Sequence, residues 1–432
     1  MTEASELRIP AGIAADLVDP AAYADRRIHD GYRWLRANNP LGRAEPEGFD
    51  PFWVVTRHAD ILTVSRQNDL FHNGRSLHHV DRPGRRCAGA GGDRRQPASG
   101  PVAGPDGCAG PSKIPRTDQA WFMPANLKQL ETRVREIARA AVESLVARAD
   151  SGGGRCDFVA DLALGYPLHV IMEILGVPEA DEPRMLRLTQ ELFGAQDPDT
   201  ARILDQLTAE QYSAALHAVV ADFATYFRGI SADRRARPRD DLATLIANAE
   251  IDGAPISDLE ATGYYTIVAT AGHDTTSSST AGAIQALAQD PAEFARVKAD
   301  PSLIPGLVDE AVRWTTPVKT FMRSATADTE LAGRAIAKGD WLMLCYASGN
   351  RDETVFEDPD VFRSDRKPNR HLSFGYGAHL CLGQHLAKIE MRILFEELLP
   401  RLASLEPDGT AKLSQSWFVN GLKTLPLRFT LA

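Results

Sequence analysis

Cysteine is scarce in this chain, with five residues in 432, and their spacing is irregular. An odd number of cysteines without a repeating pattern does not suit a disulfide framework, so the sequence indicates a reducing cytoplasm. Long apolar runs are also missing from the first twenty residues, and no basic region precedes a hydrophobic core there. These absences predict a cytoplasmic protein without a secretion signal or a membrane anchor.

No basic arm or stripe offsets the net charge of −10, which argues against a nucleic-acid partner. Internal repeats and linker-like boundaries are not evident either. With 44% hydrophobic and 25% charged residues, the composition is that of an ordinary globular protein with a substantial core. Although the length would allow two or three domains, we expect a single domain over residues 1–432.

Hydrophobic periodicity predicts a mainly α protein with small β-sheets. In the clearest case, Leu127, Leu130 and Val134 begin a run of apolar residues at three- and four-residue spacing. Helices are expected at 21–38, 58–67, 126–149, 168–175, 182–193, 210–230, 241–249, 257–288, 305–314 and 384–399. Short strands are expected at 52–56, 321–325 and 340–344.

The stretch Phe374–Gly383 leads directly into the last expected helix and holds Cys381 among three glycines, Gly375, Gly377 and Gly383. Glycine can adopt positive φ and lets a flat cofactor approach the backbone. The N–H groups at the start of the helix are expected to lower the pKa of the thiol. Cys381 is therefore a candidate metal ligand of the kind that suits a haem iron. The alternative is a buried structural cysteine, whereas zinc would need further ligands at short spacing.

Two other patterns lie on expected helices. Residues 271–280 are rich in short hydroxyl side chains, which compete for backbone hydrogen bonds and make a poor helix unless they have another purpose. A hydroxyl-rich helix packed on its neighbours is the alternative. Glu310 and Arg313 are three residues apart on one helical face, and by itself such a pair is most often a solvated surface pair.

These patterns resemble those of the cytochrome P-450 family of haem-thiolate monooxygenases. Phe-x-x-Gly-x-x-x-Cys-x-Gly at 374–383 is similar to the family's haem-binding loop, and Ala-Gly-x-Asp-Thr-Thr at 271–276 is similar to its oxygen-binding groove. Runs such as Leu307–Trp314 and His379–Ala387 look like the bacterial terpineol-oxidising branch. The resemblance implies the cytochrome P-450 fold, with haem b between the long central helix and the cysteine-loop helix.

The resemblance also implies roles for single residues. Cys381 would ligate the iron, with Phe374, Gly375, Gly377 and Gly383 forming the loop around the cofactor. Asp274 and Thr275 would relay protons during oxygen activation, and Ala271 and Gly272 would line the groove. His273 is expected to be a packing or surface residue.

Further positions match the family away from the two motifs. Arg323 and His371 correspond to residues that bind haem propionates, although an ordinary surface charge is the alternative for each. Glu310 and Arg313 correspond to a structural ion-pair network that Arg366 would complete. The segments that border the substrate cavity hold residues whose apolar character suggests a hydrophobic ligand, namely Val318, Thr320, Phe321, Met322, Trp417 and Phe418.

The activity implied by the resemblance is hydroxylation of a small terpenoid, such as terpineol, or of an alkyl-aromatic hydrocarbon. Dioxygen would be the oxidant, and electrons would come from a ferredoxin and its NAD(P)H-dependent reductase. Two alternatives stay open. One is a peroxide-driven peroxygenase, for which the Asp274–Thr275 pair would be superfluous. The other is an inactive haem-binding relic.

Residues 78–118 do not fit the rest of the chain, because they are rich in Gly, Ala, Arg and Pro and have almost no apolar periodicity. A disordered loop is one interpretation. The other is a pair of compensating frameshifts, since permissible codons for Asp106–Asp118 can spell Met-Asp-Ala-Pro-Asp-His-Pro-Arg-Tyr-Arg-Ala-Leu-Thr in the next frame. That resembles a family helix whose His and Arg bind a haem propionate, where this chain has Pro111 and Pro115. The codons of the coding DNA test this hypothesis.

Overall fold

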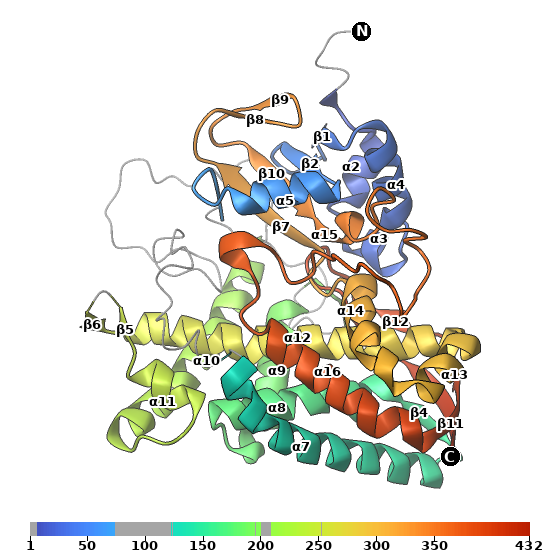
Figure 1. Ribbon diagram of the computed structural model, residues 1–432. Coiled ribbons are helices and arrows are strands. Elements are labelled where there is room, and N and C mark those ends of the chain that lie inside the picture. Colours follow the sequence, from blue (N-terminus) through green and yellow to red (C-terminus); the bar gives the residue numbers. More distant parts are fainter. Residues whose placement is uncertain (1–6, 74–121, 123, 195, 200–208, 252) are drawn as a thin grey trace.

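The computed structural model describes residues 7–73, 122, 124–194, 196–199, 209–251 and 253–432. The prediction of a mainly helical protein with small sheets is confirmed (Figure 1). The anomalous segment 78–118 lies outside the described residues. The described helices are α2 (Ala11–Asp16), α3 (Pro20–Ala24), α4 (Ile28–Asn38), α5 (His58–Arg66), α7 (Pro124–Ser151), α8 (Gly165–Leu175), α9 (Glu182–Phe193), α10 (Ala209–Ala236), α11 (Leu242–Ala247), α12 (Asp258–Gln289), α13 (Pro291–Ala299), α14 (Ile304–Thr315), α15 (Tyr346–Gly349) and α16 (Gln384–Leu398).

The largest described sheet has five strands in the order β1-β2-β10-β7-β3. A second has three strands in the order β11-β14-β4, and three two-stranded ribbons pair β5 with β6, β8 with β9 and β12 with β13. The strands are β1 (Leu41–Ala44), β2 (Phe52–Val55), β3 (Phe71–His72), β4 (Arg155–Asp157), β5 (Glu250–Ile251), β6 (Ala254–Pro255), β7 (Thr320–Ala325), β8 (Thr329–Leu331), β9 (Arg334–Ile336), β10 (Trp341–Cys345), β11 (Leu402–Pro407), β12 (Lys412–Leu413), β13 (Leu422–Thr424) and β14 (Pro426–Leu431).

Helix α12 is the axis of the helical part and crosses the whole width of the molecule in Figure 1. It begins at a capping box, in which the Ser257 hydroxyl accepts a hydrogen bond from the Glu260 N–H and the Glu260 carboxylate accepts one from the Ser257 N–H. Helix α8 packs on α12, while α14 and α16 also contact it, and α7 lies along α16. The cysteine-loop helix therefore packs directly against the long central helix.

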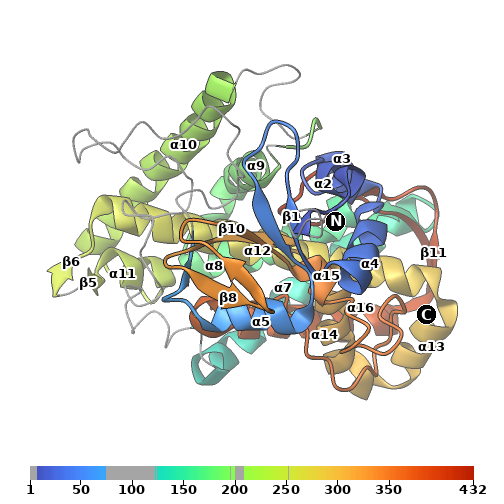
Figure 2. The same ribbon diagram turned by 90° about the horizontal axis from the view of Figure 1, so that it is seen from above.

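The core is divided between the helices and the sheet. Apolar residues of α7, α8, α12, α14 and α16 form one large buried cluster, and two smaller clusters lie on the two faces of the five-stranded sheet. In Figure 2, seen from above, β10 of the five-stranded sheet and the separate β8 strand lie over the helices around α12. Both parts supply residues to the region around Cys381, as described below.

Two expectations about helices need correction. The helix expected at 21–38 is two helices, α3 and α4, because Arg26 adopts a left-handed φ of 65° that a continuous right-handed helix does not allow. Helix α13 was not expected. Its start is capped by the Asp290 carboxylate, which accepts hydrogen bonds from the N–H groups of Ala292 and Glu293, with Pro291 at the first helical position.

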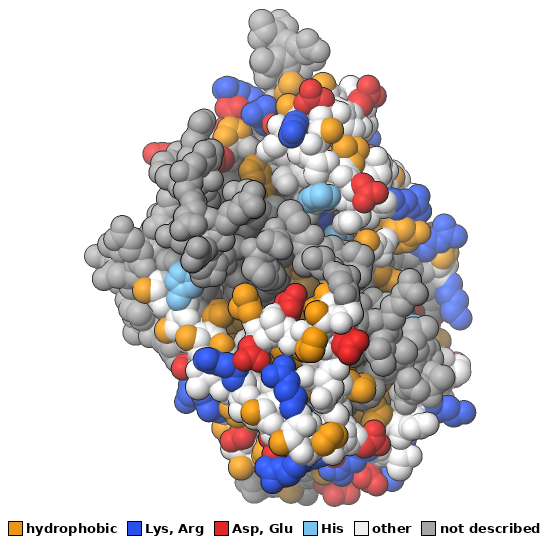
Figure 3. Space-filling view, turned by 90° about the vertical axis from the view of Figure 1, so that its left-hand side faces the viewer, with side chains coloured by type: hydrophobic (Ala, Val, Ile, Leu, Met, Phe, Trp, Pro, Cys, Tyr) orange, Lys and Arg blue, Asp and Glu red, His pale blue; other side chains and the backbone are white. Residues whose placement is uncertain are grey.

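Charges of both signs are interspersed over the lower, described part of the face in Figure 3, with hydrophobic side chains scattered between them. That part of the surface has no patch of a single sign. None of the helices in the described part of the chain combines the length and the apolar run that a membrane crossing needs.

Candidate functional site

The cysteine loop is a tight backbone structure in which Cys381 is fixed by its own N–H, which donates to the Phe374 carbonyl at 2.7 Å. Gly375 and Gly377 both adopt left-handed φ, at 70° and 67°. A Cβ at Gly377 would lie 2.6 Å from the Ser65 carbonyl oxygen, so only glycine lets the loop approach α5 this closely. A Cβ at Gly383 would meet no other atom within 4 Å, so the backbone there faces open space.

The loop is held from below by Asn350, which follows α15. Its side-chain oxygen accepts a hydrogen bond from the Leu372 N–H at 2.6 Å, and its amide donates to Thr316 Oγ1 and Ser373 Oγ, each at 2.8 Å. Ser373 in turn donates to the Val312 carbonyl of α14. These buried and partly buried contacts join the start of the loop to α14 and α15. Sequence reasoning missed Asn350, because nothing near it in the chain marks it.

The sulfur of Cys381 is reached by solvent, yet protein surrounds it closely enough to perturb its ionisation. Burial raises the pKa of the thiol, and hydrogen bonds from the backbone N–H groups of Gly383 and Gln384 lower it. The balance is a raised pKa, so the expectation of a lowered one is wrong for the protein alone. The two N–H donors do have the predicted effect, but desolvation is larger.

The hydroxyl-rich part of α12 remains a regular helix because its side chains bond back to the helix. The hydroxyls of Thr275, Thr276 and Ser279 donate to the carbonyls four residues earlier, Thr275 to Ala271 at 2.7 Å. Asp274 is partly buried, and its side chain makes no hydrogen bond with the described residues. Burial raises the pKa of its carboxyl to about 6. It can therefore exchange a proton near neutral pH.

Gly272 and His273, which precede Asp274 and Thr275, pack against other parts of the protein. A Cβ at Gly272 would lie 3.0 Å from Ile171, so this glycine allows α12 and α8 to pack closely. His273 is fully buried, and its Nε2 donates to the Leu164 carbonyl at 2.9 Å. Burial lowers the pKa of His273 to about 4, so the ring is neutral and packs as part of the core.

Arg323, on β7, is a buried cation without an acidic partner among the described residues. Its side chain is 3% exposed, donates to the Met322 carbonyl and lies over the Phe321 ring. Burial lowers its pKa. Burial also lowers the pKa of His379 to about 4, and the positive charges of Arg323 and His72 lower it further. This corner of the site is therefore electropositive and could accept a carboxylate.

His371 lies at the entrance to the loop, with its ring 5.4 Å from that of Phe374. Its Nε2 is 3.9 Å from the Asp309 carboxylate, which also pairs with Lys388. Its Nδ1 is buried and has no hydrogen-bond partner within the described ranges. Like the Arg323 guanidinium, His371 Nδ1 is thus available to bind a polar group of a ligand.

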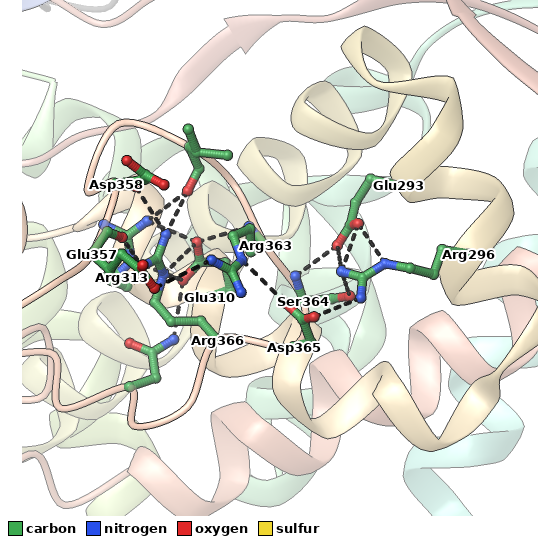
Figure 4. Close-up of polar contacts among 12 residues, drawn as sticks. Glu293, Arg296, Glu310, Arg313, Glu357, Asp358, Arg363, Ser364, Asp365 and Arg366 are labelled. Carbon is green, nitrogen blue, oxygen red and sulfur yellow. Dashed lines mark hydrogen bonds and ion pairs between the residues drawn. The ribbon is translucent and has the colours of Figure 1, made fainter.

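Glu310 is the centre of a buried ion-pair network (Figure 4). Arg313 donates two hydrogen bonds to its carboxylate, at 2.7 and 2.8 Å, and Arg366 donates to both of its oxygens at 3.1 Å. Glu310 and Arg313 are both 0% exposed, so the solvated-pair interpretation does not apply. Because Arg366 also donates to the carbonyls of Glu357 and Val361, the network ties α14 to the irregular stretch before the cysteine loop.

A second network from α13 fastens the same stretch. Glu293 accepts hydrogen bonds from Arg296 and from the Ser364 N–H at 2.7 Å, while Arg296 donates to Asp365 at 2.8 Å (Figure 4). Glu293 is only 8% exposed. Sequence reasoning missed this network, although Glu293 and Arg296 repeat the three-residue spacing of Glu310 and Arg313.

Aromatic rings from separate parts of the chain meet beside Arg323. Phe321 of β7 lies 5.5 Å from Phe418, and Phe418 lies 6.2 Å from Phe193 of α9. Tyr346 of α15 contacts the other side of Phe321 at 5.9 Å. Val318 bridges to Val419 in the same region. This aromatic cluster (Phe193, Phe321, Tyr346 and Phe418) is partly exposed except for Tyr346, so it can form an apolar wall.

The donor set fits a haem better than a bare metal ion. In the described part of the chain, no three His, Cys, Asp or Glu side chains gather to hold a metal. An iron porphyrin brings its own four nitrogen ligands and two carboxylates. It therefore needs one further protein ligand, which Cys381 in its glycine loop could supply, and partners for the carboxylates. Arg323 and the unpartnered Nδ1 of His371 could be those partners.

The fold and this site suit a haem enzyme, and comparison with known proteins agrees. The model of the cytochrome P-450 family matches residues 117–431, so the chain belongs to the cytochrome P-450 family and is a monooxygenase of that family. Cytochrome P-450-terp from Pseudomonas sp is 46% identical over 433 residues, covering 98% of this chain and 99% of that protein.

Other relatives give the same result. Linalool 8-monooxygenase from Pseudomonas putida is 32% identical, covering 95% of this chain and 97% of its own. The crystal structure of CYP108D1 from Novosphingobium aromaticivorans DSM12444 superposes with a TM-score of 0.85 and 42% identity, covering 98% of this chain and all of that one. The expected cytochrome P-450 fold is thus confirmed, and family membership implies a haem cofactor.

Proposed function

We propose that this protein hydroxylates a small hydrophobic substrate, a monoterpenoid such as terpineol or an alkyl-aromatic hydrocarbon. The observation that carries the proposal is the aromatic cluster of Phe193, Phe321, Tyr346 and Phe418 beside Arg323. Such a wall favours a compact apolar ligand by burying its surface. The identity of 46% to cytochrome P-450-terp over nearly the whole chain supports the terpenoid class.

In this proposal the cofactor is haem b, with Cys381 as the iron ligand. Arg323 and His371 would bind its propionates. Arg323 is a buried cation without an acidic partner among the described residues, and His371 has a buried Nδ1 without a hydrogen-bond partner there. Phe374 and the loop glycines, Gly375, Gly377 and Gly383, would hold the cofactor at the cysteine loop. The haem supplies the redox chemistry that activates dioxygen, with two electrons from a ferredoxin and its reductase.

The balanced reaction consumes substrate, dioxygen, two electrons and two protons, and yields the hydroxylated product and water. We assign proton movement to Asp274 and Thr275, with Ala271 beside them at the groove. The Asp274 carboxyl, with its pKa of about 6, can both take and release a proton near neutral pH. Thr275 holds its hydroxyl hydrogen toward Ala271, which leaves the oxygen free to accept a further hydrogen bond.

The substrate proposal is tested by titrating the haem-loaded protein with monoterpenes and alkylbenzenes and recording the haem absorption spectrum. We expect saturable spectral shifts with terpineol-sized ligands and weak ones with long-chain fatty acids. Val318, Phe321 and Phe418 contribute to the wall, so Phe418→Ala should weaken the shift for monoterpenes. Equal responses to both ligand classes would contradict the proposal.

Asp274→Asn is expected to lower turnover with the ferredoxin system by about 10²-fold or more, the usual size of a general acid–base contribution. The carboxamide keeps the shape of the side chain but cannot carry the proton. Turnover rate and the carbon monoxide spectrum are measured together, and the spectrum should not change. A variant with undiminished turnover would show that Asp274 does not relay protons.

The same variant has a second readout in stability. The folded pKa of Asp274, about 6, lies above the ordinary value of 3.8 for an aspartate, so the folded state binds more protons between these two values. The cost of the buried charge is therefore absent at low pH and complete above pH 6, at about 3 kcal/mol. Urea unfolding at pH 5 and pH 7.5 should show the Asn variant gaining stability relative to wild type as the pH rises.

A further inference from the structure

A cavity of about 40 Å³ lies between α3 and α4 on one side and the C-terminal half of α12 on the other. The ends of α14 and the ribbon of β12 and β13 complete its walls. Cys381, Asp274 and Thr275 are not among the residues that line it. Its volume suits about three water molecules or one small ion, since a single water needs roughly 10–15 Å³.

The polar lining of this cavity is positive. It includes Arg26, His29, Lys319 and Arg351, whereas no aspartate or glutamate is found among the described lining residues. The three cations act on the His29 ring. Burial lowers the pKa of His29 well below its usual value, and the positive charges of Arg351, Arg26 and Lys319 lower it further. The three cations therefore give the cavity a positive potential, with Lys319 buried and Arg26 exposed to solvent.

Lys319 is the group whose charge is least compensated. It is 4% exposed, and its Nζ is buried without a hydrogen-bond partner in the described structure. Its nearest favourable contact is the face of the Tyr23 ring, with Nζ 4.9 Å from the ring centroid. The Tyr23 hydroxyl bonds elsewhere, since it donates to the Leu17 carbonyl and contacts the Tyr32 hydroxyl. Burial lowers the pKa of Lys319 to about 7.

The other basic groups have partners that Lys319 lacks. Arg26 donates to the side-chain oxygen of Gln285, and Arg351 donates to the Trp314 carbonyl and lies 3.4 Å from the Asp360 carboxylate. A second unpartnered polar atom in the lining is Thr315 Oγ1, which is buried and forms no hydrogen bond with described residues. An ammonium and a hydroxyl, both unsatisfied, thus line one small positive cavity.

We propose that this cavity is a binding site for a small monovalent anion of the size of chloride, nitrate or formate, contacted by Lys319 and Thr315. A buried ammonium without a partner is strongly unfavourable, and an anion both pairs the charge and accepts its hydrogen bonds. Arg26 and Arg351 add attraction without direct contact, whereas the neutral His29 ring adds none. Water filling the cavity around a neutral lysine is the competing arrangement.

The first test measures thermal unfolding while sodium chloride replaces sodium gluconate at constant ionic strength, with gluconate too large to enter. A ligand that binds only the folded state raises the melting temperature as it saturates the site. We expect a saturable rise for the wild type and for Lys338→Met, which removes an exposed lysine elsewhere. Lys319→Met should lose the saturable rise.

The Lys319→Met variant is expected to fold, because methionine has a similar length and removes a buried cation. The proposal is overturned if the wild type does not respond to chloride, or if Lys319→Met responds equally. A second test soaks crystals in bromide and locates it by anomalous scattering. Bromide within contact distance of Lys319 Nζ supports the site, while water alone in the cavity of a bromide-soaked crystal overturns it.

Discussion

Replacing Cys381 with serine is expected to abolish monooxygenase turnover and the carbon monoxide absorption band that is diagnostic of a thiolate ligand. Serine keeps the size and the two backbone hydrogen bonds from Gly383 and Gln384, but its hydroxyl does not ionise at neutral pH. The electron donation that a thiolate gives to a haem iron is then lost. Both properties are measured on the same purified sample, with turnover driven by a ferredoxin and its reductase.

Cys156→Ser is the matched control, since Cys156 is another unpaired cysteine and lies on β4, at the edge of the second sheet. It should retain both the band and the turnover. If the Cys381 variant kept them, the assignment of the iron ligand would be wrong. Turnover of the wild type with peroxide but never with reduced ferredoxin would instead favour the peroxygenase.

Glu310→Ala is expected to destabilise the protein by about 3–5 kcal/mol, the usual cost of removing one partner from a buried ion pair. Arg313 and Arg366 would both lose their carboxylate while remaining buried. The irregular stretch before the cysteine loop would lose its connection to α14, so we also expect weaker haem retention. Urea unfolding gives the first quantity, and haem loss to an excess of apomyoglobin gives the second.

A surface pair provides the comparison for Glu310→Ala. Arg133 pairs with Glu136 and Glu173, but its side chain is 47% exposed. Arg133→Ala should therefore change the free energy of unfolding by about 1 kcal/mol or less. Equal effects of the two substitutions would mean that the buried network contributes no more than an exposed one.

The sequence predicted those features that short-range patterns encode. The spacing of Leu127, Leu130 and Val134 located α7, and the glycine loop around Cys381 identified the cofactor class before any geometry was known. The left-handed Arg26 could not be predicted, because arginine rarely adopts that conformation and only packing selects it. The raised pKa of Cys381 depends on how much protein surrounds the sulfur, which local sequence does not reveal.

Other features could not be predicted from the sequence because they depend on contacts between residues far apart in the chain. Asn350 joins Thr316, Leu372 and Ser373, which are 22 to 34 residues away along the chain. An asparagine after a short helix carries no mark of that role. The contact of Gly272 with Ile171 could not be predicted, since a glycine in a helix allows close approach on whichever side the neighbouring helix lies. The expected place of Gly272 at the groove stays a prediction. The roles of Arg323, His371, Asp274 and Thr275 stay predictions.

The aromatic cluster is assembled from α9, β7, α15 and the segment before β13, none of which belongs to the cysteine loop. Under the proposed function, ligand choice would rest on these elements and iron ligation on the cysteine loop, while β7 would serve both through Phe321 and Arg323. Substitutions at Phe193 or Phe418 would then change which ligand binds while the cysteine loop stays intact. Related proteins with this fold could thereby acquire new substrates and keep the same cofactor site.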